Sequence, residues 1–123
     1  MTRRFNMEPI FRRIMFYYDR APGIVYMELI IVNIFDAKTK EHLMTAHMDL
    51  CAWRKTKETR IVHLRSTSRN ELWRKGATSG NEMKVISMWL DCDYDAVDIY
   101  VEIQGNGVAC HTGQKSCFFN EVS

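Results

Sequence analysis

The segment MKVISMWLDCDYDAVDIYVEI, residues 83–103, contains two apolar runs separated by five residues, three of which are aspartate. In the second run aliphatic and polar side chains alternate, which is typical of a strand with one buried face and one wet face. The aliphatic positions are Val97, Ile99, Val101 and Ile103, and the polar ones are Asp98, Tyr100 and Glu102. The first run, residues 83–90, predicts a second strand. The segment therefore predicts two strands that meet at an acidic tip.

Other parts of the chain predict more strands and one clear helix. Residues 24–35 are rich in Ile, Val and Leu, and a polar turn connects them to a second strand at 42–46, which predicts a hairpin. Asp49 is a candidate N-cap for a helix over residues 50–58. Residues 60–65 predict another short strand. Five or six strands beside one or two helices predict an α+β fold with mostly antiparallel pairing in a single small domain.

The N-terminal residues 1–22 are interpreted as an extension to a domain over residues 23–123. Pro9 suits the first turn of a helix, and the next apolar residues would form one stripe of it. Those residues are Ile10, Phe11, Ile14 and Met15. This end is basic through Arg3, Arg4, Arg12 and Arg13, and a solvated helix docked on the body is favoured over a nucleic-acid-binding arm.

Composition bounds the class of protein. The chain has 123 residues, 46% of them hydrophobic and 26% charged, as in ordinary globular domains. A net charge of +2 does not indicate a nucleic-acid or membrane partner, and no apolar run is long enough to cross a bilayer. Four cysteines are few for a disulfide scaffold, so we expect a cytoplasmic protein.

The acidic tip is a candidate metal site. In an extended segment Asp91, Asp93 and Asp95 would share one face, and Cys92 would point the other way. Carboxylates suit magnesium or manganese, whereas thiolates and imidazole suit zinc. An acidic turn between two strands is, however, more often only a solvated turn, and the spacing alone leaves both interpretations open.

Two further cysteines, Cys110 and Cys117, follow the second strand, and His111 lies beside the first of them. Three thiolates would leave the fourth tetrahedral position of zinc open, as in catalytic zinc sites. The spacing matches neither a zinc ribbon nor a zinc knuckle, and a cysteine in a small intracellular domain usually packs as a small hydrophobe. We expect Cys51, in the predicted helix, to pack in this way.

A loop at residues 73–80 contains two glycines and two hydroxyl side chains, Thr78 and Ser79. Its backbone N–H groups could cradle a phosphate, with Arg69 and Lys75 supplying positive charge. The alternative is a connecting loop with basic tips, and the loop alone does not distinguish the two.

Three motifs in register resemble the phosphoribosyl-AMP cyclohydrolase family of histidine biosynthesis: LWRKGATSG at 72–80, DCDYDA at 91–96, and ACHTG followed by SCF within 109–118. The resemblance extends from about residue 29 to residue 119. It implies a zinc- and magnesium-dependent enzyme, an intertwined homodimer, that opens the adenine ring of phosphoribosyl-AMP at the N1–C6 bond. The implied nucleophile is a zinc-bound hydroxide. No nucleic-acid or membrane partner is implied.

The resemblance also implies roles for individual residues. Cys92, Cys110 and Cys117 match the zinc ligands, the first from one subunit and the other two from its partner. The magnesium carboxylates are matched by Asp91, Asp93 and Asp95. His111 is the candidate for proton transfer, because its ordinary pKa lies near neutrality. The expected substrate-binding residues are Arg69, Trp73, Lys75, Thr78, Ser79 and Gly80.

The chain departs from the family pattern at several positions. Tyr94 stands where glycine is usual, and we expect its ring to crowd the metal or to force the tip into a less bent path. Ala77 stands where glutamate is common. The other departures are a longer loop at 105–109, Arg60 for glycine, Leu64 and Arg65 for an aromatic pair, and His47 for tyrosine. They motivate two alternatives: a catalytically weakened zinc-clamped dimer with a structural role, and a nucleotide-binding module without turnover.

Overall fold

The computed structural model describes residues 8–17 and 23–123 and contains, within them, seven strands and one helix. In chain order these are β1 (Arg12–Tyr17), β2 (Ile24–Asp36), β3 (His42–Met48), α1 (Leu50–Thr59), β4 (His63–Ser66), β5 (Glu71–Arg74), β6 (Met83–Leu90) and β7 (Ala96–Ile103).

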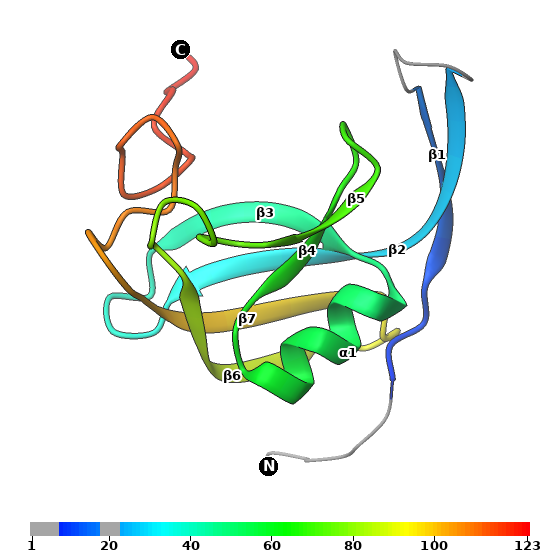
Figure 1. Ribbon diagram of the computed structural model, residues 1–123, viewed down its shortest axis with the longest axis horizontal. Coiled ribbons are helices and arrows are strands. Elements are labelled where there is room, and N and C mark those ends of the chain that lie inside the picture. The colour runs from blue at the N-terminus through cyan, green and yellow to red at the C-terminus, as the bar shows by residue number, and fades with distance from the viewer. Residues whose placement is uncertain (1–7, 18–22) are drawn as a thin grey trace.

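The long strand β2 organises the sheet. Its first half pairs with β1, and its second half lies between β3 and β7, with β6 beyond β7. All of these pairs are antiparallel except β2–β7, which is parallel. The paired parts of β1 and β2 project from the body as an arm (Figure 1). The prediction of a small α+β domain with mostly antiparallel strands and one or two helices is therefore confirmed, with one helix among the described residues.

The helix and the β4–β5 hairpin lie over one face of the sheet (Figure 1). Helix α1 begins as predicted at Asp49, whose carboxylate accepts a 2.8 Å hydrogen bond from the Ala52 N–H. It ends at Arg60, which adopts the left-handed conformation with φ 61° and donates its N–H to the Thr56 carbonyl. Among the described residues no helix has the length and apolarity needed to span a bilayer. The core contains Val32, Ile34, Trp53, Val62, Leu64, Val97, Ile99 and Val101, all buried.

The helix expected near Pro9 is wrong over residues 12–17, which form β1. This strand pairs with β2 from Arg12 opposite Leu29 to Tyr17 opposite Ile24. The apolar residues there fit both a helical and a strand periodicity. Hydrogen bonding to the long neighbouring strand β2 selects the strand. Residues 8–11, where the helix was also expected, form neither helix nor strand. Residues 1–7 and 18–22 of the expected extension lie outside the described residues.

Two other boundaries differ from the sequence predictions. The strand expected from Arg60 begins only at His63, because Arg60 still serves as the helix cap. Trp73, expected in a loop, belongs to β5 and pairs with Leu64 of β4. This hairpin was missed because all four residues of β5 are exposed and show no apolar alternation.

Candidate functional site

The acidic tip between β6 and β7 is a closed turn. The Asp91 N–H donates to the Ala96 carbonyl at 3.0 Å, and the Tyr94 N–H donates to the Asp91 carbonyl at 3.2 Å. An Asp91 carboxylate oxygen also accepts from the N–H groups of Asp95 and Ala96, at 3.1 and 3.2 Å. The expectation of an extended segment with alternating faces is therefore wrong, since the strands end at Leu90 and begin again at Ala96.

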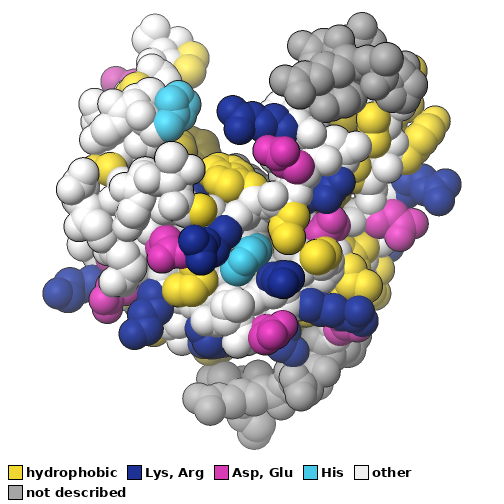
Figure 2. All heavy atoms as spheres, viewed as in Figure 1, with side chains coloured by type: hydrophobic (Ala, Val, Ile, Leu, Met, Phe, Trp, Pro, Cys, Tyr) yellow, Lys and Arg dark blue, Asp and Glu magenta, His cyan; other side chains and the backbone are white. Residues whose placement is uncertain are grey.

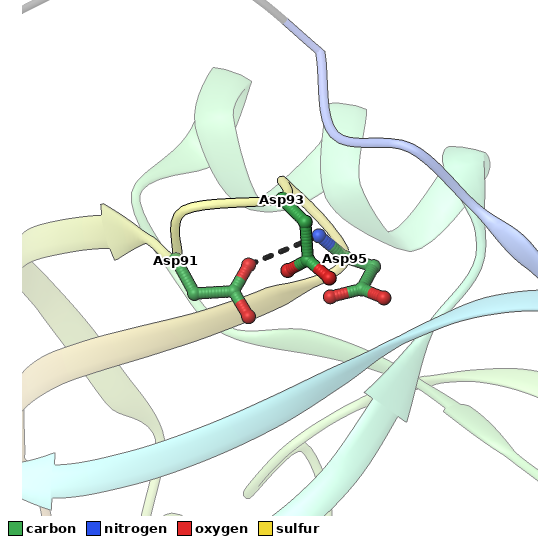
Figure 3. A group of neighbouring side chains, drawn as sticks. All are labelled: Asp91, Asp93 and Asp95. Atoms are coloured by element: carbon green, nitrogen blue, oxygen red, sulfur yellow. Dashed lines mark hydrogen bonds between the residues drawn. The ribbon is translucent and has the colours of Figure 1, made fainter.

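The turn nevertheless brings the three carboxylates together. One oxygen from each of Asp91, Asp93 and Asp95 lies within 4.8 Å of the others, and the side chains point toward one another (Figure 3). Hydrogen bonds to Asp95 and then Asp91 raise the pKa of Asp93. Hydrogen bonds from Asp93 and then Arg12 lower the pKa of Asp95. Three carboxylates this close together form a set of hard oxygen ligands that fits a magnesium ion.

Tyr94 keeps the bend that glycine would provide. Its φ is 65°, in the left-handed region that a residue with a side chain adopts only at a cost. The expectation that a tyrosine here forces a less bent path is therefore wrong. The backbone stays folded because the Tyr94 carbonyl accepts a 2.6 Å hydrogen bond from the Ile10 N–H and its own N–H bonds to Asp91.

Two of the three candidate zinc ligands lie together after β7. The loop that carries them is closed by hydrogen bonds from the Ala109 N–H to the Lys115 carbonyl and from the Cys110 N–H to the Gln114 carbonyl. Its far end is fixed to β3 by the Cys117 N–H, which donates to the Leu43 carbonyl at 2.7 Å. These bonds place both thiols at one end of the sheet.

The two thiols differ in their affinity for a proton. Hydrogen bonds from Thr112, whose hydroxyl lies 3.0 Å from the sulfur, lower the pKa of Cys110, and Cys117 and Lys75 act in the same direction. Burial and the hydrogen bond to Cys110 raise the pKa of Cys117. Two neighbouring cysteine sulfurs are a soft donor pair that fits zinc, which displaces the thiol protons when it binds.

Cys92 does not join these two cysteines within one chain. It is exposed in the acidic turn, at the opposite end of β7 from Cys110. Eight extended residues, the length of β7, span roughly 26 Å. Within the described part of the chain, the three aspartates are the only group of three or more potential metal ligands in close proximity.

Cys51 is exposed, and the expectation that it packs in the core is wrong. The buried face of α1 is formed by Ala52, Trp53 and Thr56, which leaves Cys51 on the other side of the helix.

A pocket of about 810 Å³ opens between the β4–β5 hairpin and the loop after β7. It corresponds to the hollow at the top of Figure 2, beside the C-terminal segment. Five of the six expected substrate-binding residues line it, and Gly80 does not: the five are Arg69, Trp73, Lys75, Thr78 and Ser79. The exposed His111 and the candidate zinc ligand Cys110 line the same pocket. Parts of the chain more than thirty residues apart thus form one chamber.

Asn81 organises this chamber, and the sequence analysis missed it. It is buried, and its side-chain oxygen accepts a 2.7 Å hydrogen bond from the Asn106 N–H. A Cβ on Gly76 would collide with the Asn81 backbone, so the tight approach needs glycine there. Neither contact follows a sequence pattern; the only available signal was an amide residue directly after Ser79-Gly80.

Comparison with known proteins identifies the family. A family model described as phosphoribosyl-AMP cyclohydrolase matches residues 44–119. A phosphoribosyl-AMP cyclohydrolase of Brucella anthropi is 48% identical over 94 residues, which cover 76% of this chain and 67% of the relative. A protein of the same name from Brucella abortus is also 48% identical over 94 residues, covering 79% of its length. The chain therefore belongs to the phosphoribosyl-AMP cyclohydrolase family, hydrolases of histidine biosynthesis.

Proposed function

We propose that this protein hydrolyses the N1–C6 bond of the adenine ring of phosphoribosyl-AMP. The observation that carries the proposal is the pocket in which basic and hydroxyl side chains of residues 66–79 face Cys110 and His111. One wall suits a phosphorylated nucleotide, and the opposite wall carries a potential metal ligand, Cys110, and an imidazole, His111. Membership of the family supplies the identity of the nucleotide.

The residues of the first wall bind the substrate in this proposal. Arg69 and Lys75 supply charge for a phosphate, and Thr78 and Ser79 supply hydroxyl donors. Trp73 offers an aromatic face to a base or ribose ring. The backbone of Gly80, just outside the pocket lining, completes the loop.

Zinc is held, in this proposal, by Cys110 and Cys117 of one subunit and Cys92 of another. When bound, zinc supplies a nucleophile at neutral pH by lowering the pKa of its coordinated water to about 7. His111 provides the proton that N1 requires when the N1–C6 bond breaks, because its side chain is exposed on the pocket wall. Asp91, Asp93 and Asp95 would hold magnesium, whose positive charge would attract substrate oxygens.

The position of β7 supports the proposal of a homodimer with shared sites. Because this strand separates Cys92 from the other two thiols, a three-thiol site needs a second chain, and a two-fold axis then creates two equivalent sites. Each half of the ligand set lies beside exposed apolar side chains. Ile86 and Trp89 on β6 are 50% and 49% exposed, and Phe118 and Phe119 after Cys117 are 60% and 47% exposed. Burial of these surfaces against each other would stabilise the dimer.

The decisive test of shared sites mixes a Cys92→Ala chain with a Cys110→Ala,Cys117→Ala chain. After subunit exchange has been verified, each heterodimer should regain one zinc site and about half the activity of a wild-type dimer, because one interface has every ligand and the other has none. Recovery of neither zinc nor turnover would contradict shared sites.

The activity itself is tested by incubation of the purified protein with zinc, magnesium and phosphoribosyl-AMP, with ring opening followed in the ultraviolet spectrum. Cys110→Ser should lose both zinc and turnover, whereas the matched control Cys51→Ser, on the exposed face of α1, should keep both. Asp93→Asn should keep zinc and lose turnover most severely at low magnesium.

A second candidate is a zinc-clamped dimer that has lost most of its catalysis. The observation that favours it is Ala77, which lines the pocket without a charged group. Full zinc content with no ring opening would support this alternative. In either case the thiols must stay reduced to bind metal, and on that ground we propose a cytoplasmic location.

A further inference from the structure

The segment that leads into β1 and the first residue of that strand reach the aspartate turn, although they lie outside the residues that the family model matches. The Arg12 Nε donates to the Asp95 carboxylate at 3.2 Å, and the Ile10 N–H donates to the Tyr94 carbonyl at 2.6 Å. These contacts join the N-terminal strand to the loop that carries the candidate magnesium ligands.

Further contacts fix the segment in this position. Both carboxylate oxygens of Glu8 accept from Arg54 of α1, at 3.0 and 3.2 Å. Phe11 packs against the core. The position of Arg12 is therefore fixed on both sides of it in the chain. The ion pair between Glu8 and Arg54 lies before it, and the pairing of β1 with β2 begins at it.

Arg12 places a permanent positive charge beside the carboxylate cluster. Its side chain is 53% exposed and that of Asp95 is 27% exposed, so the interaction is only partly screened by water. A divalent cation among Asp91, Asp93 and Asp95 would feel repulsion from this guanidinium, and it would share the Asp95 oxygens with it. The Arg12 guanidinium and a bound metal ion would thus interact with the same Asp95 carboxylate.

We propose that Arg12 is an internal counter-ion that competes with the divalent cation for Asp95, so that the N-terminal segment sets the metal affinity of the aspartate turn. The inference rests on the proposed metal role of the three aspartates. Arg12 is a positioning residue here and takes no part in the chemistry. By thermodynamic linkage, the cation weakens the Arg12–Asp95 contact by the same factor by which Arg12 weakens cation binding.

Titration of the zinc-loaded protein with Mn²⁺, followed by electron paramagnetic resonance of the free ion, tests the inference without any assay of turnover. At low ionic strength Arg12→Gln should bind Mn²⁺ about two- to five-fold more tightly than the wild type, the range expected for a partly exposed ion pair. Added salt should reduce the difference. Arg12→Lys, which restores the charge, should return the affinity toward the wild-type value.

Arg13→Gln is the matched control. Arg13 is the next residue of β1 and pairs with Glu28 at 3.8 Å, with its side chain 71% exposed, so its removal should leave Mn²⁺ affinity unchanged. A second readout in the wild type is the nuclear magnetic resonance signal of the Arg12 Nε–H group. Magnesium should shift this signal and accelerate its exchange with water.

The outcomes separate the inference from the function on which it rests. If Asp93→Asn weakens Mn²⁺ binding while Arg12→Gln and wild type bind equally, the counter-ion role is wrong and the metal site stands. If the wild type binds no Mn²⁺, or Asp93→Asn binds as tightly, the metal role of the aspartates is wrong, and the inference fails with it.

Discussion

The ammonium of Lys75 donates a 2.6 Å hydrogen bond to the carbonyl oxygen of Ala109, the residue before Cys110. This bond ties the loop of candidate substrate-binding residues to the loop of candidate zinc ligands. Burial lowers the pKa of Lys75, while the neighbouring Cys117 and Cys110 act in the opposite direction. The nitrogen also lies 5.1 Å from the centre of the Trp73 ring. Lys75 thus connects the two loops that form the pocket and also places a positive charge on the pocket lining.

Replacement of Lys75 by methionine should destabilise the protein, because the Ala109 carbonyl loses a charged donor. The free energy of unfolding in urea should fall by about 1–3 kcal/mol. In the metal-free protein the Cys110 thiolate also loses a nearby positive charge, so its pKa should rise and its alkylation at neutral pH should slow. Lys84→Met, at an exposed position of β6, is the control and should change neither quantity. Unaltered stability in Lys75→Met would show that the bond contributes nothing.

Replacement of Tyr94 by glycine should relieve the backbone strain of the aspartate turn. At φ 65° a side chain costs about 1 kcal/mol or more relative to glycine. Tyr94→Gly should therefore unfold at a higher urea concentration than Tyr94→Ala, which removes the same ring but keeps a Cβ. A comparison of these two variants isolates the backbone contribution from contacts of the tyrosine ring. Equal midpoints for glycine and alanine would mean that the turn relaxes without cost.

Alanine at Gly76 should be far more damaging than alanine at Gly80. Both glycines have positive φ, 85° and 81°, so each substitution pays about 1 kcal/mol of backbone strain. Only at Gly76 would the new Cβ collide with the Asn81 backbone, whereas it meets open space at Gly80. We expect Gly76→Ala to lose at least about 2 kcal/mol more than Gly80→Ala in urea unfolding, since backbone has to move. Similar losses would contradict the close approach.

Stability should decline on mild acidification because of His47. Burial lowers the pKa of this histidine below its usual 6.5, so the unfolded chain takes up a proton at a higher pH than the folded one. The folded state therefore loses stability as the pH falls below about 6.5 and through the lower folded value. His47→Tyr removes this contribution and should lose less stability than the wild type between about pH 7.5 and pH 5 in urea unfolding. Parallel pH profiles for the two proteins would contradict the role of His47.

The sequence by itself determined the elements whose signals are local. Alternating aliphatic residues marked β7, Asp49 marked the start of α1, and a polar turn marked the β2–β3 hairpin; all three agree with the structure. The three motifs also sufficed to indicate the family, because they recur as short uninterrupted stretches. Side-chain alternation and helix capping depend on neighbours within a few residues, and a sequence displays such neighbours directly.

Only the tertiary structure decided how these parts meet. Residues 12–17 became a strand because β2 offers them a partner, and the acidic segment became a closed turn through bonds from Asp91 to Ala96. The bond from Lys75 to Ala109 and the ion pair from Arg12 to Asp95 join residues 34 and 83 positions apart. Contacts of such sequence separation depend on which surfaces pack together once hydrogen bonds and apolar burial are satisfied across the whole chain, and no local pattern encodes them.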